Sequence, residues 1–230
     1  MDILRAAWKA YEMQGAPARL HVLARALTCP FGRLIERFPE TGAVLDLGCG
    51  HGLLLNLLAR DERRRGLRLH GIDHDAAKIG AARRTAPPGV RFSTAGLDAI
   101  RGAEFDAVAI VDVLYTVRRE AWGEILAGCF RVLRPGGRLI VKEVVDRPRW
   151  KYGAIMAQET LSVRVLGITR GERPHFEAPA VYRRAIEAAG FALREQAPLE
   201  SASWISHHLF VAEKPGAPPA AFVTAGPRAR

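Results

Sequence analysis

VLDLGCGHG, residues 44–52, decides the fold of this chain. An apolar run ends in an acid, three glycines follow at alternate positions, and a second apolar run covers residues 53–58. Glycine is needed where the backbone takes a positive φ or comes very close to a ligand. The pattern therefore predicts a buried strand, a tight loop and a helix that begins at once.

The glycine spacing separates this loop from two common phosphate-binding loops. It reads G-x-G-x-G, whereas the dinucleotide fingerprint is G-x-G-x-x-G, and the chain contains no G-x-x-x-x-G-K-[ST] run. Residues 46–52 resemble the first motif of the class I S-adenosylmethionine-dependent methyltransferases. A plain strand-to-helix turn is the alternative use of the same glycines. The resemblance implies cofactor contacts at Asp46, Gly48, Cys49, Gly50 and Gly52.

A second acidic residue follows a short strand expected over residues 67–73. Asp73 ends this strand roughly 20 residues past the glycine loop, where an acid binds the ribose hydroxyls in a βαβ nucleotide site. In the family the next residue often packs on the adenine, which implies that role for His74. The alternative is that Asp73 or Asp75 caps a helix beginning near Ala76.

The third strand, residues 90–94, is followed by the turn that touches adenine in the family. The family usually has Gly-Asp where this chain has Ala95-Gly96. The adenine-directed acid is therefore missing or displaced to Asp98, and the backbone at Leu97 is the other candidate contact.

Residues 105–115 resemble the central strand of the family, with a Phe-Asp opening and a polar carboxyl end. Ligands in open α/β sheets bind beyond the carboxyl ends of the strands. We therefore expect Asp112 and Tyr115 to face the methionine end of the cofactor and the acceptor, although Tyr115 also suits a packed core position. Residues 130–143 resemble the family's helix, Pro-Gly-Gly turn and fifth strand.

These ordered resemblances imply a Rossmann-like α/β fold, with a seven-stranded, mostly parallel sheet, an antiparallel last strand and helices on both faces. We expect an N-terminal helical extension or lid at residues 1–40 and a cofactor-binding domain at 41–214. A helix over 181–190, ended by Gly190, precedes strands at 191–195 and 208–213. Residues 147–180 are expected to be an acceptor-side insertion, and 215–230 a flexible tail.

Methyl transfer to a hydroxyl or an acidic carbon benefits from a general base within hydrogen-bond reach. His175 lies in the expected acceptor region and is the favoured candidate, followed by Glu143 and Tyr115. A structural salt bridge is the alternative for Glu143. A packed neutral histidine is the expected state of His207 or His208, and His51 is expected to contact only the cofactor.

The composition limits which binding partners, metal sites and cellular compartment are expected. The net charge of +10 is compatible with an acidic carrier protein or an anionic membrane surface, but the basic residues are scattered and no nucleic-acid-binding module is recognisable. The three cysteines form no C-x-x-C pair, so no metal site is expected. The absence of a signal-peptide core and of a long apolar run predicts a cytoplasmic protein.

The sequence thus predicts an S-adenosylmethionine-dependent methyltransferase that acts on a hydroxyl or carbon of a small lipid-like, quinone-like or polyketide-like metabolite. An NAD-dependent oxidoreductase and a non-catalytic cofactor-binding partner are the alternatives. Nucleic-acid methylation is disfavoured, because residues 112–115 read Asp-Val-Leu-Tyr and lack the two prolines of the Asp/Asn-Pro-Pro-Tyr motif. The acceptor and the oligomeric state stay open.

Overall fold

The computed structural model describes residues 2–145, 175–199 and 205–216 of the chain. Its α-helices are α1 (Ile3–Ala10), α2 (Ala16–Thr28), α3 (Phe31–Ile35), α4 (Leu53–Leu58), α5 (Ala76–Thr85), α6 (Trp122–Val132) and α8 (Pro179–Ala188). Short 3-10 turns are η1 (Glu62–Arg64), η2 (Leu97–Ala99), η3 (Leu114–Thr116) and η4 (Arg119–Ala121). The strands are β1 (Thr41–Leu47), β2 (Gly66–Asp73), β3 (Val90–Thr94), β4 (Phe105–Val111), β5 (Leu133–Val144), β6 (Ala192–Leu199) and β7 (His207–Glu213).

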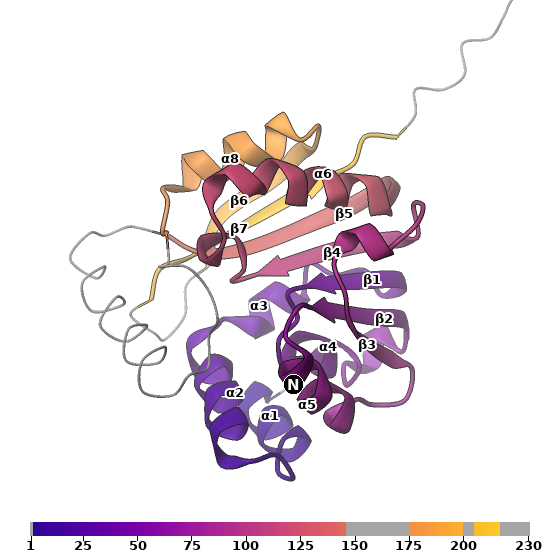
Figure 1. Ribbon diagram of the computed structural model, residues 1–230, viewed down its shortest axis with the longest axis vertical. Helices are drawn as coiled ribbons and strands as arrows, with labels where there is room; N and C mark the ends of the chain where they lie inside the picture. Colours follow the sequence, from indigo (N-terminus) through magenta and orange to yellow (C-terminus); the bar gives the residue numbers. More distant parts are fainter. Residues whose placement is uncertain (1, 146–174, 200–204, 217–230) are drawn as a thin grey trace, which may run out of the picture.

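The seven strands form one sheet in the order β3-β2-β1-β4-β5-β7-β6 (Figure 1). The pairs from β3 through β5 are all parallel, whereas β7 runs antiparallel to both of its neighbours, β5 and β6. The predicted mostly parallel sheet with an antiparallel last strand is therefore confirmed.

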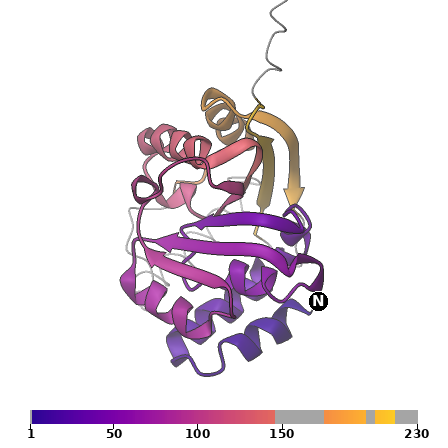
Figure 2. The same ribbon diagram turned by 90° about the vertical axis from the view of Figure 1, so that its right-hand side faces the viewer.

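Helices cover both faces of the sheet, so β1 and β4 are buried on both sides (Figure 2). Parallel strands covered in this way read as nearly continuous apolar runs, which is why the sequence revealed them. Successive side chains point to opposite faces. Val44 and Ala107 pack in the cluster that includes α1 to α5, while Leu45 and Val108 pack in the cluster that includes α6 and α8.

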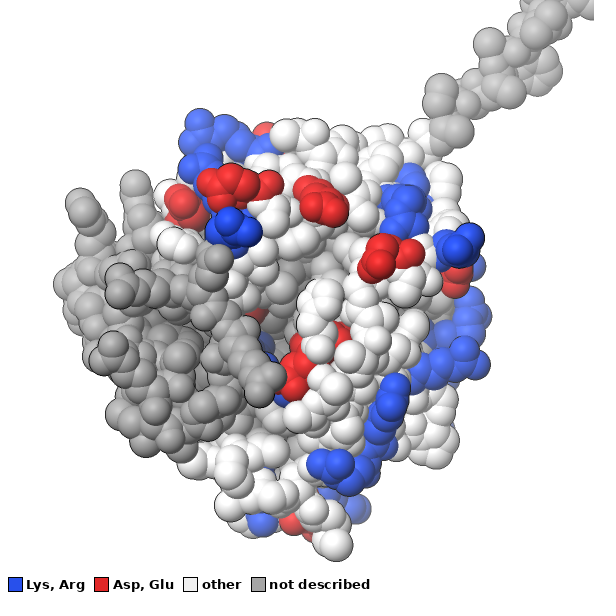
Figure 3. All heavy atoms as spheres, in the orientation of Figure 1, with Lys and Arg blue, Asp and Glu red and all other residues white. Residues whose placement is uncertain are grey.

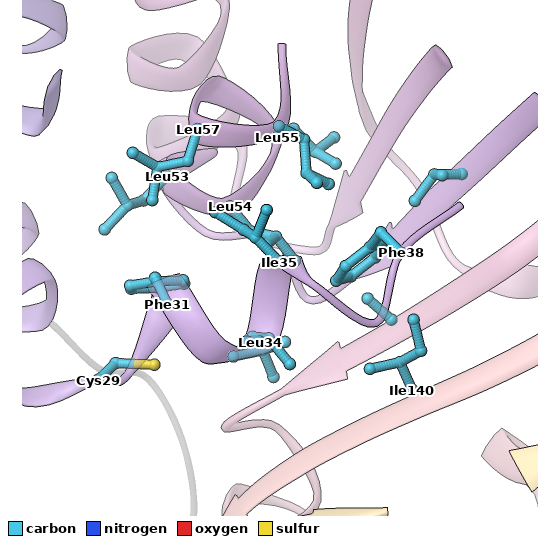
Figure 4. Close-up of a cluster of buried hydrophobic side chains, with 14 of the residues drawn as sticks. Cys29, Phe31, Leu34, Ile35, Phe38, Leu53, Leu54, Leu55, Leu57 and Ile140 are labelled. Atoms are coloured by element: carbon cyan, nitrogen blue, oxygen red, sulfur yellow. The ribbon is translucent and has the colours of Figure 1, made fainter. Parts of the chain in front are cut away.

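The N-terminal extension is helical, as predicted, and it shares the core of the sheet. Figure 4 shows α3 side chains, among them Phe31 and Leu34, gathered with the α4 leucines Leu54 and Leu57. All four are buried in the same apolar cluster as the β5 residue Ile140. Residues 1–40 therefore do not form a separate folding unit.

Two elements differ in their limits from the prediction. The Pro-Gly-Gly stretch lies inside β5 as an irregularity, because the pairing with β4 shifts from Phe105–Leu133 to Ala107–Arg138. Gly136 at this shift has φ +78°. The last helix, α8, begins with Pro179, since proline is tolerated in a first helical turn.

The remaining predictions concern the end of α8, the acceptor-side insertion and the C-terminal tail. Gly190 follows α8 with φ +93°, as expected for a helix-ending glycine. Of the predicted insertion (147–180) and tail (215–230), residues 147–174 and 217–230 lie outside the described residues.

Candidate active site

The strand order places a crevice between the carboxyl ends of β1 and β4. These strands are neighbours, but the chain continues from β1 to β2 on one side and from β4 to β5 on the other. Such a switch point is where open α/β sheets bind ligands. Figure 3 shows that the molecule is hollowed beside these strand ends, with acidic and basic atoms inside the hollow.

The glycine loop after β1 forms one wall of the crevice. Gly48, Gly50 and Gly52 all have positive φ, at +71°, +53° and +80°. A Cβ on Gly48 would lie 2.6 Å from Cγ2 of Val113, on the loop after β4, whereas a Cβ on Gly50 would meet no protein atom within 4 Å. The loop therefore packs tightly at Gly48 and leaves open space at Gly50 for a ligand. Cys49 lies half-buried between them.

Asp73 ends β2 beside this loop, with both carboxylate oxygens directed by backbone amides. The N–H of Gly50 donates to Oδ2 at 2.9 Å, and the N–H of Asp75 donates to Oδ1 at 2.8 Å. Each oxygen keeps a lone pair for a second donor, so the carboxylate suits the two hydroxyls of a ribose. The helix-cap alternative is confirmed for Asp75, whose side chain accepts from the N–H groups of Ala77 and Lys78.

The expected adenine contacts gather at the end of β3. A Cβ on Gly96 would lie 3.5 Å from Cε1 of His74 and 2.5 Å from Oδ1 of Asp98, so these two side chains flank one position. The carbonyl of Leu97 accepts from the guanidinium of Arg131 at 2.6 Å. The structure thus brings the three predicted residues together next to Asp73.

Asp46 lies buried near the carboxyl end of β1. None of the hydrogen bonds and ion pairs found among the described residues involves its carboxyl group. Burial raises the pKa of Asp46 to about 8, against the opposing influence of Arg25. A carboxyl group in this state gains most from a cationic or hydrogen-bonding ligand.

Asp112 follows β4 and is the one non-glycine residue with positive φ in the described part of the chain, at +60°. Its Oδ1 accepts from Nζ of Lys142 at 2.6 Å, and its Oδ2 accepts from a guanidinium N–H of Arg25 at 2.8 Å. Burial alone would raise the pKa of Asp112, but the two cations together lower it to about 2. The predicted cofactor residue therefore already pairs with two protein cations.

Sequence reasoning missed both of these cations. Lys142 carried a usable signal, because a lysine inside an apolar run that forms a buried strand must find a partner. Arg25 carried none, since an arginine on an amphipathic helix is ordinarily a surface residue.

Glu143 is buried on the opposite face of β5 from Lys142 and shapes the loop after β4. Its Oε1 accepts from the N–H groups of Val113 and Leu114 at 3.1 and 2.9 Å, and its Oε2 accepts from the N–H of Tyr115 at 3.4 Å. Burial raises the pKa of Glu143 to about 8. In the described structure the carboxylate of Glu143 accepts hydrogen bonds from backbone amides, in place of the salt bridge that was the alternative. A catalytic role for Glu143 stays a prediction.

The other two candidate bases lie side by side. The N–H of His175 donates to the carbonyl of Tyr115 at 2.7 Å, and the rings of Tyr115 and Phe176 are 5.0 Å apart. Tyr115 is buried, whereas His175 is exposed. The structure therefore brings Tyr115 and His175 together at the end of β4, and their catalytic roles stay predictions.

The remaining histidines have packing roles in the described structure. His207 is buried, its Nε2–H donates to the carbonyl of Thr28 at 2.8 Å, and burial lowers its pKa to about 3. The prediction of a packed neutral histidine is confirmed at this position. His208 lies against Phe210, with ring centroids 5.1 Å apart. The carbonyl of His51 accepts from the Tyr11 hydroxyl at 2.6 Å, which ties the glycine loop to the N-terminal helices.

Similarities to known proteins agree with this geometry. The family model described as "Methyltransferase domain" matches residues 44–137. A ubiquinone biosynthesis O-methyltransferase of Xylella fastidiosa is 30% identical over 176 residues, which cover 74% of this chain and 69% of that protein. The chain belongs to the class I S-adenosylmethionine-dependent methyltransferases. This membership sets aside the nicotinamide alternative.

Two further similarities concern a second curated relative and, for the fold alone, a solved structure. The enzyme of the same name from Aeromonas salmonicida is 31% identical over 160 residues, 66% of this chain and 63% of that one. A solved S-adenosylmethionine-dependent methyltransferase from Methanosarcina mazei shares the fold, with a TM-score of 0.63 and 18% identity over 80% of this chain and 98% of that chain. The methyltransferase thus spans 63% to 69% of the length of these two curated relatives.

Two features are absent from the described residues. None of the helices there is long and apolar enough to cross a membrane. No group of three or more His, Cys, Asp or Glu side chains in that part of the chain is arranged to hold a metal ion.

Proposed function

We propose that this methyltransferase transfers the methyl group of S-adenosylmethionine to a hydroxyl oxygen or a carbon of a small, largely apolar, quinone-like acceptor. The observation that carries the proposal is an apolar group beside the cofactor crevice, at the carboxyl ends of β4 and β5. Its members are Tyr115, Val144, Phe176 and Ile205. The names of the curated relatives support a ring-bearing acceptor of this kind.

The residues around the crevice suit the cofactor at both ends. The backbone amides that direct the carboxylate of Asp73 support its role as a ligand of the ribose hydroxyls, and the closeness of His74 and Asp98 supports a role in binding adenine. The open backbone at Gly50 allows close approach. When bound, the cofactor supplies an activated methyl group, so the protein's task is to hold the acceptor atom about 3–3.5 Å from the methyl carbon and in line with the leaving sulfur.

The N-terminal helices suit the exclusion of water from this reaction. Tyr11 from the end of α1 contacts the glycine loop, and Arg25 from α2 reaches Asp112 beyond β4. These contacts join the N-terminal helices to the loops after β1 and β4. We therefore assign α1 and α2 the role of a lid over cofactor and acceptor.

The experiment has two stages. Calorimetry measures binding of S-adenosylmethionine, S-adenosylhomocysteine and NAD to wild type and to Asp73→Ala, with Glu62→Ala, at an exposed carboxylate, as the control. We expect micromolar binding of the first two ligands alone, weakened at least tenfold in Asp73→Ala, because charged hydrogen bonds to the ribose contribute about 1.5–3 kcal/mol each.

The second stage follows the methyl group. Protein and methyl-labelled cofactor are incubated with an alkyl-substituted hydroquinone and with a small-molecule extract of cells. Label in the organic-soluble products supports the proposal. Cofactor binding without any transfer of label would instead support the non-catalytic alternative. Docking of an acidic carrier protein or an anionic membrane surface stays a prediction.

A further inference from the structure

Four polar side chains lie together between α2, the carboxyl ends of β4 and β5 and the amino end of β7. This buried charge cluster consists of Arg25, Asp112, Lys142 and His207. Lys142 is completely buried and the Asp112 side chain is 7% exposed, but the Arg25 side chain is 30% exposed. Arg25 is therefore the member that a ligand can reach directly, with Lys142 behind it.

The cluster carries one net positive charge at neutral pH. Arg25 and Lys142 are cations, and among the described residues Asp112 is the carboxylate that pairs with them. Burial shifts three neighbouring groups toward their neutral forms: it raises the pKa of Asp46 to about 8, raises that of the Cys29 thiol, and lowers that of His207 to about 3. A buried charge without a counter-ion is costly, so the cluster is electrostatically incomplete as it stands.

An unused hydrogen-bonding atom lies in the same place. Because Nε2 of His207 donates to the carbonyl of Thr28, the proton is on Nε2 and Nδ1 is an acceptor. This buried Nδ1 has no hydrogen-bond partner among the described residues. Buried polar atoms are rarely left unpaired, and an acceptor nitrogen requires a donor, so Nδ1 suits a hydroxyl group of a ligand and does not itself contact an anionic oxygen.

The position of the cluster connects it with the acceptor. Lys142 and Val144 point to the same face of β5, because side chains alternate along a strand, and His207 pairs with Val144 across the sheet. Val144 belongs to the apolar group assigned to the acceptor. A molecule resting on that group therefore has the cluster at one end.

We propose that the buried charge cluster binds an oxyanion of the methyl acceptor, such as a carboxylate or a phenolate, so that the acceptors of this methyltransferase are anionic molecules with an apolar body. The inference rests on the proposed function. The cofactor's sulfonium is itself cationic and adds to the positive charge of the site. Its amino-acid carboxylate is the other available oxyanion, and the experiment separates the two sources.

The probe is 4-nitrophenol, whose absorbance reports its ionisation, added to the full chain saturated with S-adenosylhomocysteine. We expect the bound probe to titrate at least one pH unit lower than the free probe, which corresponds to a preference of about tenfold for the phenolate. Arg25→Gln should abolish the shift. Arg19→Gln is the matched control on the same helix, because Arg19 stacks over Trp8 away from the cluster.

A second variant should shift the titration of the bound probe in the opposite direction from Arg25→Gln. Asp112→Asn removes the carboxylate and leaves both cations, so the titration of the bound probe should move further down. Asparagine tolerates the left-handed backbone at this position better than other residues, which favours folding of the variant. If the cluster were merely structural, both substitutions would weaken binding of the probe.

Three results would overturn the proposal. The first is a probe that fails to bind the wild-type complex, and the second is a bound probe with an unshifted titration. The third is an Arg25→Gln variant that loses affinity for S-adenosylmethionine but not for decarboxylated S-adenosylmethionine, because the oxyanion would then be the cofactor's own. Failure of the proposed function is distinct, since it would appear as absent cofactor binding or absent methyl transfer, whichever way the bound probe titrates.

Discussion

Burial of His207 should make the unfolding free energy of this methyltransferase depend on pH, by an amount that follows from the pKa of its ring. Its ring is 4% exposed, and burial lowers its pKa from 6.5 to about 3. Below pH 6.5 the His207 ring therefore binds a proton in the unfolded chain but stays neutral in the folded chain. Stability contributed by neutral His207 is present above pH 6.5 and is lost as the pH falls toward 3.

The magnitude follows from the two pKa values. At pH 8 both states are neutral and the difference is close to zero. At pH 5 the ratio of the two protonation functions is roughly 30, which corresponds to about 2 kcal/mol of lost unfolding free energy. His207→Gln keeps an N–H donor for the Thr28 carbonyl but has no proton to gain in this range.

The assay is urea unfolding followed by circular dichroism at pH 8 and pH 5. The loss of unfolding free energy between these values should be about 2 kcal/mol smaller in His207→Gln than in wild type. Comparing the two losses cancels the other titrating groups. His175→Gln, at an exposed histidine, is the control. Equal losses in wild type and His207→Gln would refute the reasoning.

Two further substitutions test the crevice. Gly48→Ala should destabilise the cofactor-free protein more than Gly50→Ala, since both pay about 1–2 kcal/mol for a left-handed backbone but only Gly48→Ala places a Cβ 2.6 Å from Val113. Thermal unfolding measures both, and equal losses would show that the contact with Val113 is relieved without cost. Glu143→Gln should retain most of its turnover, because the Glu143 oxygens already accept backbone amides. A loss of 100-fold or more in kcat, with the fold intact, would show that Glu143 moves a proton.

Much of the fold was predictable because its signals are local. The run before Gly48 and the run at residues 105–111 are apolar except for one aspartate in each, Asp46 and Asp106, as is typical of buried parallel strands. Asp73 was predictable because the first βα unit sets the distance between the glycine loop and the next strand end. The Pro-Gly-Gly stretch is irregular where the sequence predicts a turn, but β5 begins before it, at Leu133, because pairing with Phe105 decides where the strand starts.

The sequence by itself determined the sheet class, the glycine loop and the acid at the end of β2, since each depends on residues close together in the chain. Only the tertiary structure decided the partners of Asp112. Arg25 lies 87 positions and Lys142 30 positions away, and nothing in the local pattern of either joins them. Packing of α2 beside the carboxyl end of β4 brings these charges together, and burial then shifts their pKa values. The chain's local pattern therefore specifies the glycine loop and the acid at the end of β2, while long-range packing assembles the charge cluster beside β4.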